Sequence, residues 1–426
     1  MSTRRYFLYV FLFITLLALS FIYFIGLDDA FAKNKKTIPH RLIYTSAVSS
    51  PLDNRENHHI VYQYTSTNGQ NVINEHDIDL IIKRMTLPQL VGQMFFSSIN
   101  TEIPNQELAN FLTNYHIGGV ILFANNIRSV RQTIELTNFI QRNSPIVSSY
   151  RIDLFIGTDQ EGGLVNRLKT IMRSKYTLSE YQMGRLYYNN PGYAEYIYYN
   201  VGRVMNYLGI NLNFAPEVDV AYNKQGFVNK QQRSYSNNPF IVTQLSQAAI
   251  KGYYSAGVIT CLKHFAGLGR ASTDPQYHPP IIDESYNTLY HTDWQPYIEA
   301  INLHDAYMIM VSHGIYPELD PRYPASLSYN IITNILRKKL HYNGVVITDD
   351  LTMGALKDYG NIAQRAIDAI NAGADIVLIC HNYQDTEKAY QEVLNAVEDG
   401  EIPKWRIIQS VRRILILKAE YGLIKY

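Results

Sequence analysis

The feature that most constrains the fold is an alternation of short apolar segments with longer amphipathic segments, from about Leu80 to the end of the chain. Eight apolar segments rich in β-branched residues recur. We predict strands within residues 90–96, 118–123, 154–157, 211–214, 258–262, 306–311, 344–348 and 374–379. We predict helices within residues 189–208, 241–256, 287–303 and 361–372. This repeated order of strand and helix is typical of parallel α/β folds.

The number of strand–helix units favours a closed barrel over an open sheet. Eight units suit a (β/α)8 TIM barrel, which needs about 250 residues or more. A doubly wound open sheet usually carries a Gly-rich phosphate loop, and neither Gly162-Gly163 nor the pair Gly267 and Gly269 fits that motif. The predicted fold class is therefore α/β, a (β/α)8 TIM barrel that forms a single catalytic domain over residues 79–426.

The N-terminal segment has the pattern of a targeting sequence. Arg4 and Arg5 precede an apolar run over residues 7–27, which is long enough to span a bilayer, and a signal peptidase could cleave after Ala32. We predict that residues 1–32 are a signal peptide or a membrane anchor and that residues 33–78 are a polar linker. The protein is then exported to the periplasm or the outside, secreted or tethered, and contacts the membrane only through residues 7–27.

Composition excludes several classes of function. The formal net charge is +1 and the cationic residues are scattered, so the basic stripe of a nucleic-acid-binding protein is missing. The two cysteines, Cys261 and Cys380, cannot form a disulfide framework, and they lack the further ligands of a structural zinc site. His58-His59 likewise has no further ligand nearby. We expect no metal and no cofactor, and the sequence makes no prediction of the oligomeric state.

Polar residues that could perform chemistry follow the apolar segments. In a barrel these positions lie at the C-terminal ends of the strands, where active sites are built. They are Asp159 and Glu161 after the third segment; Asn213, Glu217 and Asp219 at the fourth; Lys263 and His264 after the fifth; His313 after the sixth; Asp349 and Asp350 after the seventh; and His381 after the eighth. This convergence predicts one active site at that end of the barrel.

The residue types at these positions favour sugar chemistry. A retaining glycosidase needs one ionised carboxylate as the nucleophile and one proton donor, and the pair Asp349 and Asp350 offers the carboxylate. Lys263 would also suit a Schiff-base aldolase. The adjacent His264, the glycine-containing loop after it and the acid pair argue against that alternative. Metal-hydrolase patterns such as H-E-x-x-H are missing from the sequence.

Several segments resemble the motifs of glycoside hydrolase family three, in particular its single-domain bacterial β-N-acetylglucosaminidases. These segments are residues 158–163 (TDQEGG) with Asn166-Arg167, residues 233–235 (RSY), residues 263–265 (KHF) and residues 347–353 (ITDDLTM). The resemblance runs in order from about residue 83 to residue 420. It implies a barrel enzyme that acts on a carbohydrate.

The resemblance also implies a role for individual residues. Asp349 matches the nucleophile that forms the glycosyl–enzyme, and Asp350 is expected to have a structural role. The residues that match those holding the terminal sugar are Asp159, Arg167, Arg233, Lys263 and His264. Their chemistry suits this role because a carboxylate accepts hydrogen bonds from sugar hydroxyls, and cations donate to hydroxyl or acetamido oxygens.

The proton donor is the point where the sequence departs from the family pattern. The resemblance implies a histidine two residues after an aspartate, on a mobile loop after the fifth strand. Here the aspartate is Asp274, but the histidine position holds Gln276, which has no proton to give. His278 lies two residues further on and would point the same way in an extended loop. We therefore predict Asp274 and His278 as the acid/base pair, since an imidazole titrates near neutral pH.

The predicted activity is retaining hydrolysis of terminal β-linked N-acetylhexosamine from glycans, with cell-wall fragments as the expected substrate. Two alternatives remain. Because Gln276 stands at the acid/base position, the protein could be a catalytically impaired pseudo-glycosidase that binds glycans. A β-glucosidase is the second alternative.

Overall fold

The computed structural model describes residues 73–172 and 176–426. The predictions for residues 1–32, for His58-His59 and for nearly all of the linker fall outside this part of the chain. Among the described residues, no helix combines the length and the apolar character that crossing a membrane requires.

Eight parallel strands close into a barrel, which confirms the predicted (β/α)8 architecture. The strands are β1 (Phe95–Ser98), β2 (Gly119–Ile121), β5 (Phe155–Thr158), β8 (Leu212–Asn213), β9 (Ile259–Phe265), β10 (Met308–Val311), β11 (Val345–Asp350) and β12 (Ile376–Ile379). Each strand pairs with the next in this order, and β12 pairs with β1 to close the ring. Since the strands are parallel, all their C-terminal ends lie at one end of the barrel.

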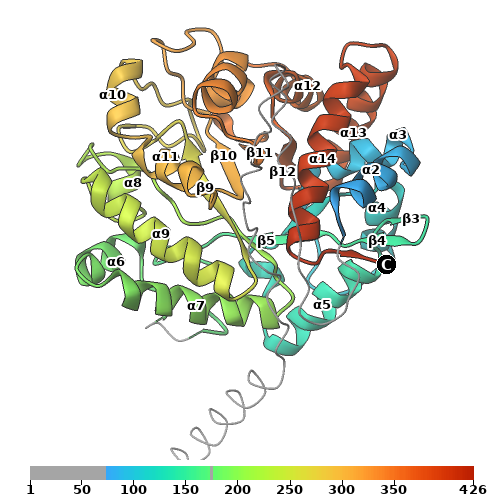
Figure 1. The fold of residues 1–426 in the computed structure, drawn as a ribbon, viewed down its shortest axis with the longest axis horizontal. Helices are drawn as coiled ribbons and strands as arrows, with labels where there is room; N and C mark the ends of the chain where they lie inside the picture. Colours follow the sequence, from blue (N-terminus) through green and yellow to red (C-terminus); the bar gives the residue numbers. More distant parts are fainter. Residues whose placement is uncertain (1–72, 173–175) are drawn as a thin grey trace, which may run out of the picture. The chain divides into compact units, whose positions relative to one another are not determined.

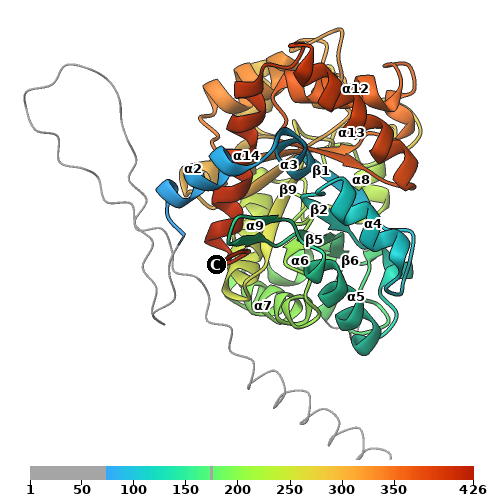
Figure 2. The same ribbon diagram turned by 90° about the vertical axis from the view of Figure 1, so that its right-hand side faces the viewer.

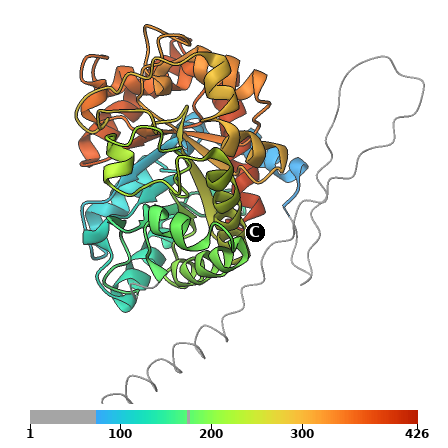
Figure 3. The same cartoon turned by 90° about the vertical axis from the view of Figure 1, so that its left-hand side faces the viewer.

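Helices surround the barrel on its outside (Figures 1 and 2). The α-helices are α2 (Glu75–Arg84), α3 (Leu87–Gln93), α4 (Gln106–Asn114), α5 (Val130–Arg142), α6 (Glu180–Tyr187), α7 (Pro191–Tyr207), α8 (Phe227–Lys230), α9 (Pro239–Ser255), α10 (Tyr286–His291), α11 (Gln295–Asn302), α12 (Ile362–Ala372), α13 (Tyr383–Glu398) and α14 (Lys404–Glu420). Short 3-10 segments are η1 (Ala124–Asn126), η3 (Ala325–Leu327) and η5 (Gly354–Leu356), and η4 (Asn330–Lys339) is π-helical. Figure 3 shows the side opposite to that in Figure 2.

Three short strand pairs lie outside the barrel. Strands β3 (Ile146–Val147), β4 (Tyr150–Ile152) and β13 (Ile424–Lys425) form an antiparallel sheet. This sheet joins the C-terminal end of the chain to the segment before β5. Strands β6 (Gln160–Gly162) and β7 (Val165–Asn166) form a hairpin directly after β5. The hairpin therefore carries part of the motif at residues 158–167 to the C-terminal end of the barrel.

The first predicted strand is largely wrong, because most of residues 90–96 belongs to helix α3. A capping box starts this helix: the Thr86 side chain accepts from the N–H of Gln89, and the Gln89 side chain accepts from the N–H of Thr86. Pro88 lies in the first turn, where a missing N–H costs nothing. The strand itself begins only at Phe95.

The predicted helix over residues 287–303 is two helices, α10 and α11. Trp294 is fully buried between them, and its indole N–H donates to the carbonyl of Ala266 at 2.8 Å. Pro296 then restarts the helix in the first turn of α11. The other three predicted helices correspond to α7, α9 and α12, and Gly373 ends α12 with a φ of 122°.

The two ends of the described chain meet on the outside of the barrel. Helix α2 begins at Glu75, where Asn74 and Asp77 form a capping box, and it lies beside α14 (Figures 1 and 2). Arg412 of α14 binds Glu75 at 2.7 Å and also binds Asp79. Helix α2, which contacts α14, therefore begins four residues before the expected boundary at residue 79.

Aromatic rings fill the barrel interior. The ring of Phe96 stacks on Phe155 at 6.1 Å between centroids and meets the edge of Phe214 at 5.6 Å. All three side chains are fully buried. Each such ring contributes roughly 2–3 kcal/mol by burial. Because the interior is packed, a substrate can bind only at the mouth of the barrel.

Candidate active site

The ends of β5 and β9 bring three of the expected sugar-binding residues together. Lys263 extends from β9, and its Nζ donates to Asp159 Oδ1 at 2.9 Å. Arg167 lies on the other side of Asp159, with Nη2 at 3.8 Å from Oδ2. The Arg167 guanidinium also covers the ring of Phe123 at 5.8 Å. The side chains of Asp159 and Arg167 remain 16% and 27% exposed, so a ligand can reach both.

Arg233 is deeper and is held by two carboxylates. Its guanidinium donates to Glu161 through Nε at 2.8 Å and through Nη2 at 2.9 Å, which is a bidentate pair. Nε also lies 2.8 Å from Glu217 Oε2. Burial by itself lowers the pKa of Arg233, but Glu161 and Glu217 outweigh it and raise the pKa well above its usual value. Arg233 is therefore a fixed cation in the site.

Glu161 connects the Arg233 pair to the Lys263 group. Its Oε1 lies 2.6 Å from Lys263 Nζ, and its side chain is only 1% exposed. Burial raises the pKa of Glu161, but Arg233 and Lys263 together hold the pKa far below its usual range. Glu161 is thus ionised, and it fixes the positions of two cations that sequence reasoning assigned to sugar binding.

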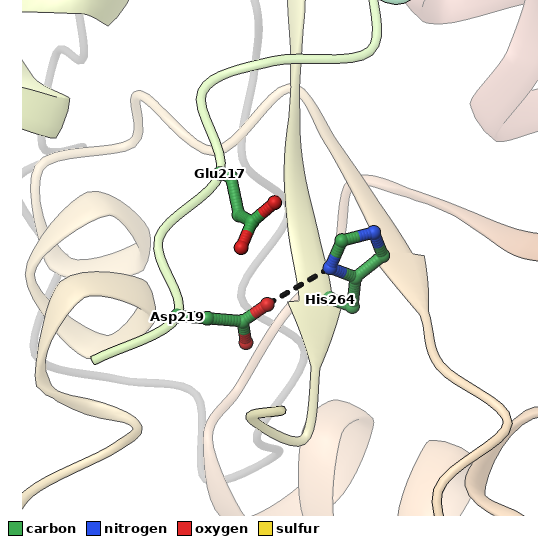
Figure 4. Close-up of side chains that lie close together, drawn as sticks. All are labelled: Glu217, Asp219 and His264. Carbon is green, nitrogen blue, oxygen red and sulfur yellow. Dashed lines mark hydrogen bonds and ion pairs between the residues drawn. The ribbon is translucent and has the colours of Figure 1, made fainter. Parts of the chain in front are cut away.

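His264 is oriented by Asp219, as Figure 4 shows. Asp219 Oδ2 accepts from His264 Nδ1 at 2.8 Å, which leaves Nε2 at 3.5 Å from Arg233 Nη2. Asp219 Oδ1 accepts the N–H of Leu268 at 2.7 Å, so the same carboxylate fixes the start of the loop after β9. Because a carboxylate only accepts, Nδ1 carries the proton of the imidazole.

Asp349 is the last residue but one of β11 and is half-buried. Burial by itself raises its pKa, but His313, His264, the N–H of Asp350 and Lys263 outweigh that effect and lower the pKa. The N–H of Asp350 donates to Asp349 Oδ1 at 2.8 Å. Asp349 is therefore ionised near neutral pH, as a nucleophilic carboxylate must be.

Asp350 has the structural role that the sequence suggested. Its Oδ1 accepts the N–H of Cys380 and the N–H of Thr352, both at 3.0 Å, and its Oδ2 accepts from Thr352 Oγ1 at 2.7 Å. His381 lies at the rim with Nε2 3.5 Å from Oδ2. These bonds join the ends of β11 and β12 and engage both carboxylate oxygens of Asp350.

The loop with the expected acid/base pair is turned rather than extended, which corrects the geometry assumed from the sequence. The N–H groups of Tyr277 and His278 both point to the carbonyl of Asp274, at 3.1 and 3.3 Å. The Asp274 carboxylate accepts the N–H of Gln276 at 2.9 Å and Gln231 Nε2 at 3.2 Å. It is thus engaged by groups other than the imidazole of His278, which is exposed.

The same loop is docked against the segment that follows Asp349. The N–H of Gly354 donates to the carbonyl of Gln276 at 3.0 Å, and the N–H of Ala355 donates to the carbonyl of Pro275 at 3.1 Å. A Cβ atom at Gly354 would lie only 2.6 Å from the carbonyl oxygen of Tyr277. The loop and the nucleophile strand are therefore in direct contact through a glycine.

Among the described residues, two groups of side chains are close enough to bind a metal ion, but the guanidinium of Arg233 already pairs with carboxylates of both groups. The first group is Glu217, Asp219 and His264, and the second is Glu161, Glu180 and Glu217. Within each group, one possible ligand atom from each residue lies within 4.8 Å of those of the other two. Arg233 lies between these carboxylates and pairs with Glu161 and Glu217. A metal ion there would lie beside a fixed guanidinium, so these residues do not fit one.

The sequence placed Glu161, Glu217 and Asp219 at strand ends in the predicted active site but assigned them no role, because nothing local indicates that they hold Arg233 and His264. Glu180 gave no signal, because it begins helix α6 rather than following a strand. Its Oε1 accepts the N–H of Glu217 at 2.7 Å, and its side chain is buried with the others.

A closed parallel barrel with ionised carboxylates and fixed cations at its C-terminal end suits a glycoside hydrolase. The comparison with known families supports this class. Residues 79–417 match the family described as "Glycosyl hydrolase family 3 N terminal domain". The chain belongs to glycoside hydrolase family 3.

Individual relatives agree with the family. The chain is 35% identical to beta-hexosaminidase A of Pseudoalteromonas piscicida over 74% of its own length and 55% of that protein. It is 31% identical to a beta-hexosaminidase of Nitrosomonas eutropha, over 69% of this chain and 83% of that protein. Among solved structures, a family 3 beta-N-acetylglucosaminidase from Paenibacillus sp. has a TM-score of 0.75 at 32% identity, with 80% of this chain and 63% of that chain covered. The chain thus spans little more than half of the first of these relatives.

Proposed function

We propose that the protein is a retaining hydrolase that removes terminal β-linked N-acetylhexosamine from glycans, with Asp349 as the nucleophile. The observation that carries the proposal is the environment of Asp349. It is an ionised carboxylate at the mouth of the barrel, and His264 and Lys263, which help to lower its pKa, belong to the network of Asp159 and Arg233.

The reaction has two steps. Asp349 attacks the anomeric carbon while an acid gives a proton to the departing oxygen, and a glycosyl–enzyme forms. A water molecule then attacks that carbon and restores the carboxylate, and the group that gave the proton now accepts one from the water. We assign this acid/base role to His278, with Asp274 at the base of its turn. The docking of this loop at Gly354 supports the assignment.

The substrate class follows from the subsite and from the relatives. Asp159 can accept hydrogen bonds from sugar hydroxyls, while Lys263, Arg167 and Arg233 can donate to hydroxyl or acetamido oxygens. Relatives named beta-hexosaminidase and beta-N-acetylglucosaminidase support an N-acetylated sugar. We propose cell-wall fragments as the source of this sugar and export, through the N-terminal segment, as the route to it.

A second function is favoured by one observation. Gln276 stands where the family pattern has its histidine, and His278 is exposed rather than held by a carboxylate. A protein with this loop that never delivers a proton would bind glycans and hydrolyse them only when the leaving group departs unaided. A β-glucosidase is the remaining enzymatic alternative, and no contact in the site favours it.

Turnover of an aryl β-N-acetylglucosaminide and of an aryl β-glucoside tests the proposal. We expect the first to be the better substrate and Asp349→Ala to abolish its turnover without loss of fold, because the side chain leaves no apolar cavity. Asp350→Asn is the matched control, since the amide keeps an acceptor for the N–H of Cys380 and should keep measurable activity. Wild-type rates in Asp349→Ala would show that the nucleophile is assigned wrongly.

A further inference from the structure

Glu180 is a buried carboxyl group with an oxygen that no protein donor satisfies. It is 1% exposed, and its Oε1 accepts the N–H of Glu217 at 2.7 Å. Its Oε2 has no hydrogen-bond partner among the described residues. The same holds for both carboxyl oxygens of Glu217, which is fully buried, although its Oε2 is in ion-pair contact with Arg233. One oxygen from each of Glu161, Glu180 and Glu217 lies within 4.8 Å of the others.

The cluster contains more acids than cations. Its five carboxyl groups belong to Asp159, Glu161, Glu180, Glu217 and Asp219, and its three permanent cations to Arg167, Arg233 and Lys263. None of the five carboxyl groups is more than 16% exposed. Uncompensated negative charge in such a place is costly, and the usual response is that one acid keeps its proton.

The distribution of partners identifies that acid. Glu161 has two cations and is ionised, and Glu217 Oε2 lies 2.8 Å from Arg233 Nε. The hydrogen bond that Glu180 accepts comes from a neutral peptide N–H rather than from a cation. Burial, followed by the charge of Glu161, raises the pKa of Glu180 well above its usual value. The pKa of Glu217 is raised as well, but its contact with Arg233 favours the ionised form there, so the proton belongs on Glu180.

Other groups around Glu180 agree with a neutral acid. The charged groups that influence it are Glu161 after β5, Lys263 of β9 and Arg233 before α9, whereas Glu217 after β8 acts on it through its backbone N–H. The phenols of Tyr198, Tyr235 and Tyr253 are also near Glu180; burial raises their pKa values, and they offer no positive charge that would favour an ionised Glu180. Tyr198 and Tyr235 share a hydrogen bond of 2.8 Å with one another.

We propose that Glu180 is a positioning residue that stays protonated at neutral pH and donates its O–H to the Glu217 carboxylate. This bond would satisfy an oxygen on each residue. It fixes Glu217, which holds Arg233, and Arg233 lies beside His264 in the sugar subsite. This inference about Glu180 rests on the proposed hydrolase function in one respect only, namely that the subsite around Arg233 binds the sugar.

The sign of the pH effect follows from linkage. A carboxyl group whose pKa is higher in the folded than in the unfolded protein stabilises the fold most below its unfolded pKa, about 4.3 for Glu. That contribution is lost as the pH rises through the folded pKa. Wild type should therefore lose stability on the alkaline side, and this loss should be absent when residue 180 cannot ionise.

The experiment compares wild type with Glu180→Gln and Glu180→Ala by thermal melting and by KM and kcat between pH 6 and about 10. At pH 7 we expect Glu180→Gln to melt at or above the wild-type Tm, because the amide needs no proton to stay neutral, and to keep KM within about threefold, because the amide also donates. Glu180→Ala should raise KM by about tenfold, the scale of one lost buried hydrogen bond, with a smaller change in kcat. Above neutral pH, the Tm and KM of wild type should worsen while those of Glu180→Gln stay flat.

Asp375→Asn is the matched control, because Asp375 is a buried carboxylate that three arginines keep ionised. We expect it to lower Tm already at pH 7, in contrast to Glu180→Gln. A Glu180→Gln variant that loses as much at pH 7 as Asp375→Asn would show that Glu180 is ionised. Parallel alkaline curves for wild type and Glu180→Gln would overturn the proposal in the same way.

These outcomes are independent of the proposed function. Melting requires no substrate, so an inactive wild type would contradict the hydrolase assignment while the melting curves still decide the protonation of Glu180. Should Glu180→Ala fail to fold, the comparison of wild type with Glu180→Gln remains sufficient.

Discussion

At the scale of single residues, the site depends on cations that are fixed before any sugar arrives. Arg233 is held bidentately by Glu161, and Lys263 is held between Glu161 and Asp159. Such prior fixing lowers the entropy that binding must overcome. His264 gains its orientation from Asp219 in the same way. The proposed proton donor is the exception, because the imidazole of His278 is exposed on a turn.

The role of His278 can be tested with substrates that differ in how readily their leaving group departs. We expect His278→Ala to slow natural-type substrates by roughly 100-fold, the usual scale of general acid catalysis, because their departing oxygen needs a proton. Activated aryl glycosides should slow much less. His381→Ala is the control, since it removes another exposed imidazole at the barrel mouth that contacts Asp350 instead.

The pseudo-glycosidase alternative gives the opposite result. In that case His278→Ala changes nothing, wild type is already slow on natural-type sugars, and Gln276→His raises the rate. Equal and small effects of His278→Ala on both kinds of substrate would exclude His278 as the acid and leave a barrel that binds sugar.

At the scale of elements, the two ends of the barrel have different tasks. The C-terminal ends of the strands carry the site, and the N-terminal ends carry a structural ion cluster around Asp375, just before β12. Its carboxylate accepts from Ser410 Oγ at 2.7 Å and from Arg413 at 3.0 Å, and it also binds Arg337. The N–H of Val346 donates to it at 2.9 Å. This cluster joins α14 and η4 to strands β11 and β12.

Asp375→Asn should destabilise the barrel without changing the chemistry. Removing the charge leaves buried arginines without their partner, which costs about 3 kcal/mol and lowers Tm by roughly 5 °C or more. Burial raises the pKa of Asp375, but Arg337, Arg413 and Arg406 outweigh it and lower the pKa. Wild type therefore keeps this stability above the unfolded pKa and loses it as the pH falls through the folded pKa, whereas the variant has no such acid-side loss.

Thermal melts between pH 3 and pH 7 and kcat per folded molecule measure this prediction. We expect the difference in Tm between wild type and Asp375→Asn to shrink on acidification while kcat per folded molecule stays equal. A change in kcat would indicate that the cluster acts on the site through β12.

At the scale of the whole molecule, one barrel supplies both the scaffold and the site. On the outside of the barrel, Arg412 of helix α14 pairs with Glu75 of helix α2. The β3–β4–β13 sheet holds the C-terminal residues of the chain. The loop after β9 contacts the segment after β11 through backbone hydrogen bonds. Candidate site residues at the ends of β5, β8, β9 and β11 thus depend on one closed sheet.

The N-terminal segment predicts export of this barrel. Fusion of residues 1–32 to a periplasmic reporter enzyme should give activity outside the cytoplasm, because two arginines precede the apolar run and acids follow it. The same fusion with Arg4→Glu and Arg5→Glu is the control and should be exported poorly. Finding the full-length wild-type protein soluble in the cytoplasm would contradict the prediction.

The amino-acid sequence by itself determined the barrel and the candidate site positions. Both depend on information that is local in the chain: alternating apolar segments define the strands, and polar residues directly after them must lie at one end of a closed parallel sheet. Short motifs such as those around Asp159 and Asp349 are local too. The sequence also held the capping box at Thr86 and Gln89, which the strand assignment for residues 90–96 overlooked.

The tertiary structure alone decided how the charges are shared. Glu180 and Glu217 are 37 positions apart, and no period or motif links a residue at the start of α6 to an acid after β8. The bond of Asp274 to Gln231 and the docking of its loop on Gly354 likewise join segments that are distant in the chain. The reason is physical: electrostatic and hydrogen-bond energies depend on distances of a few ångströms in space, and only folding sets these distances.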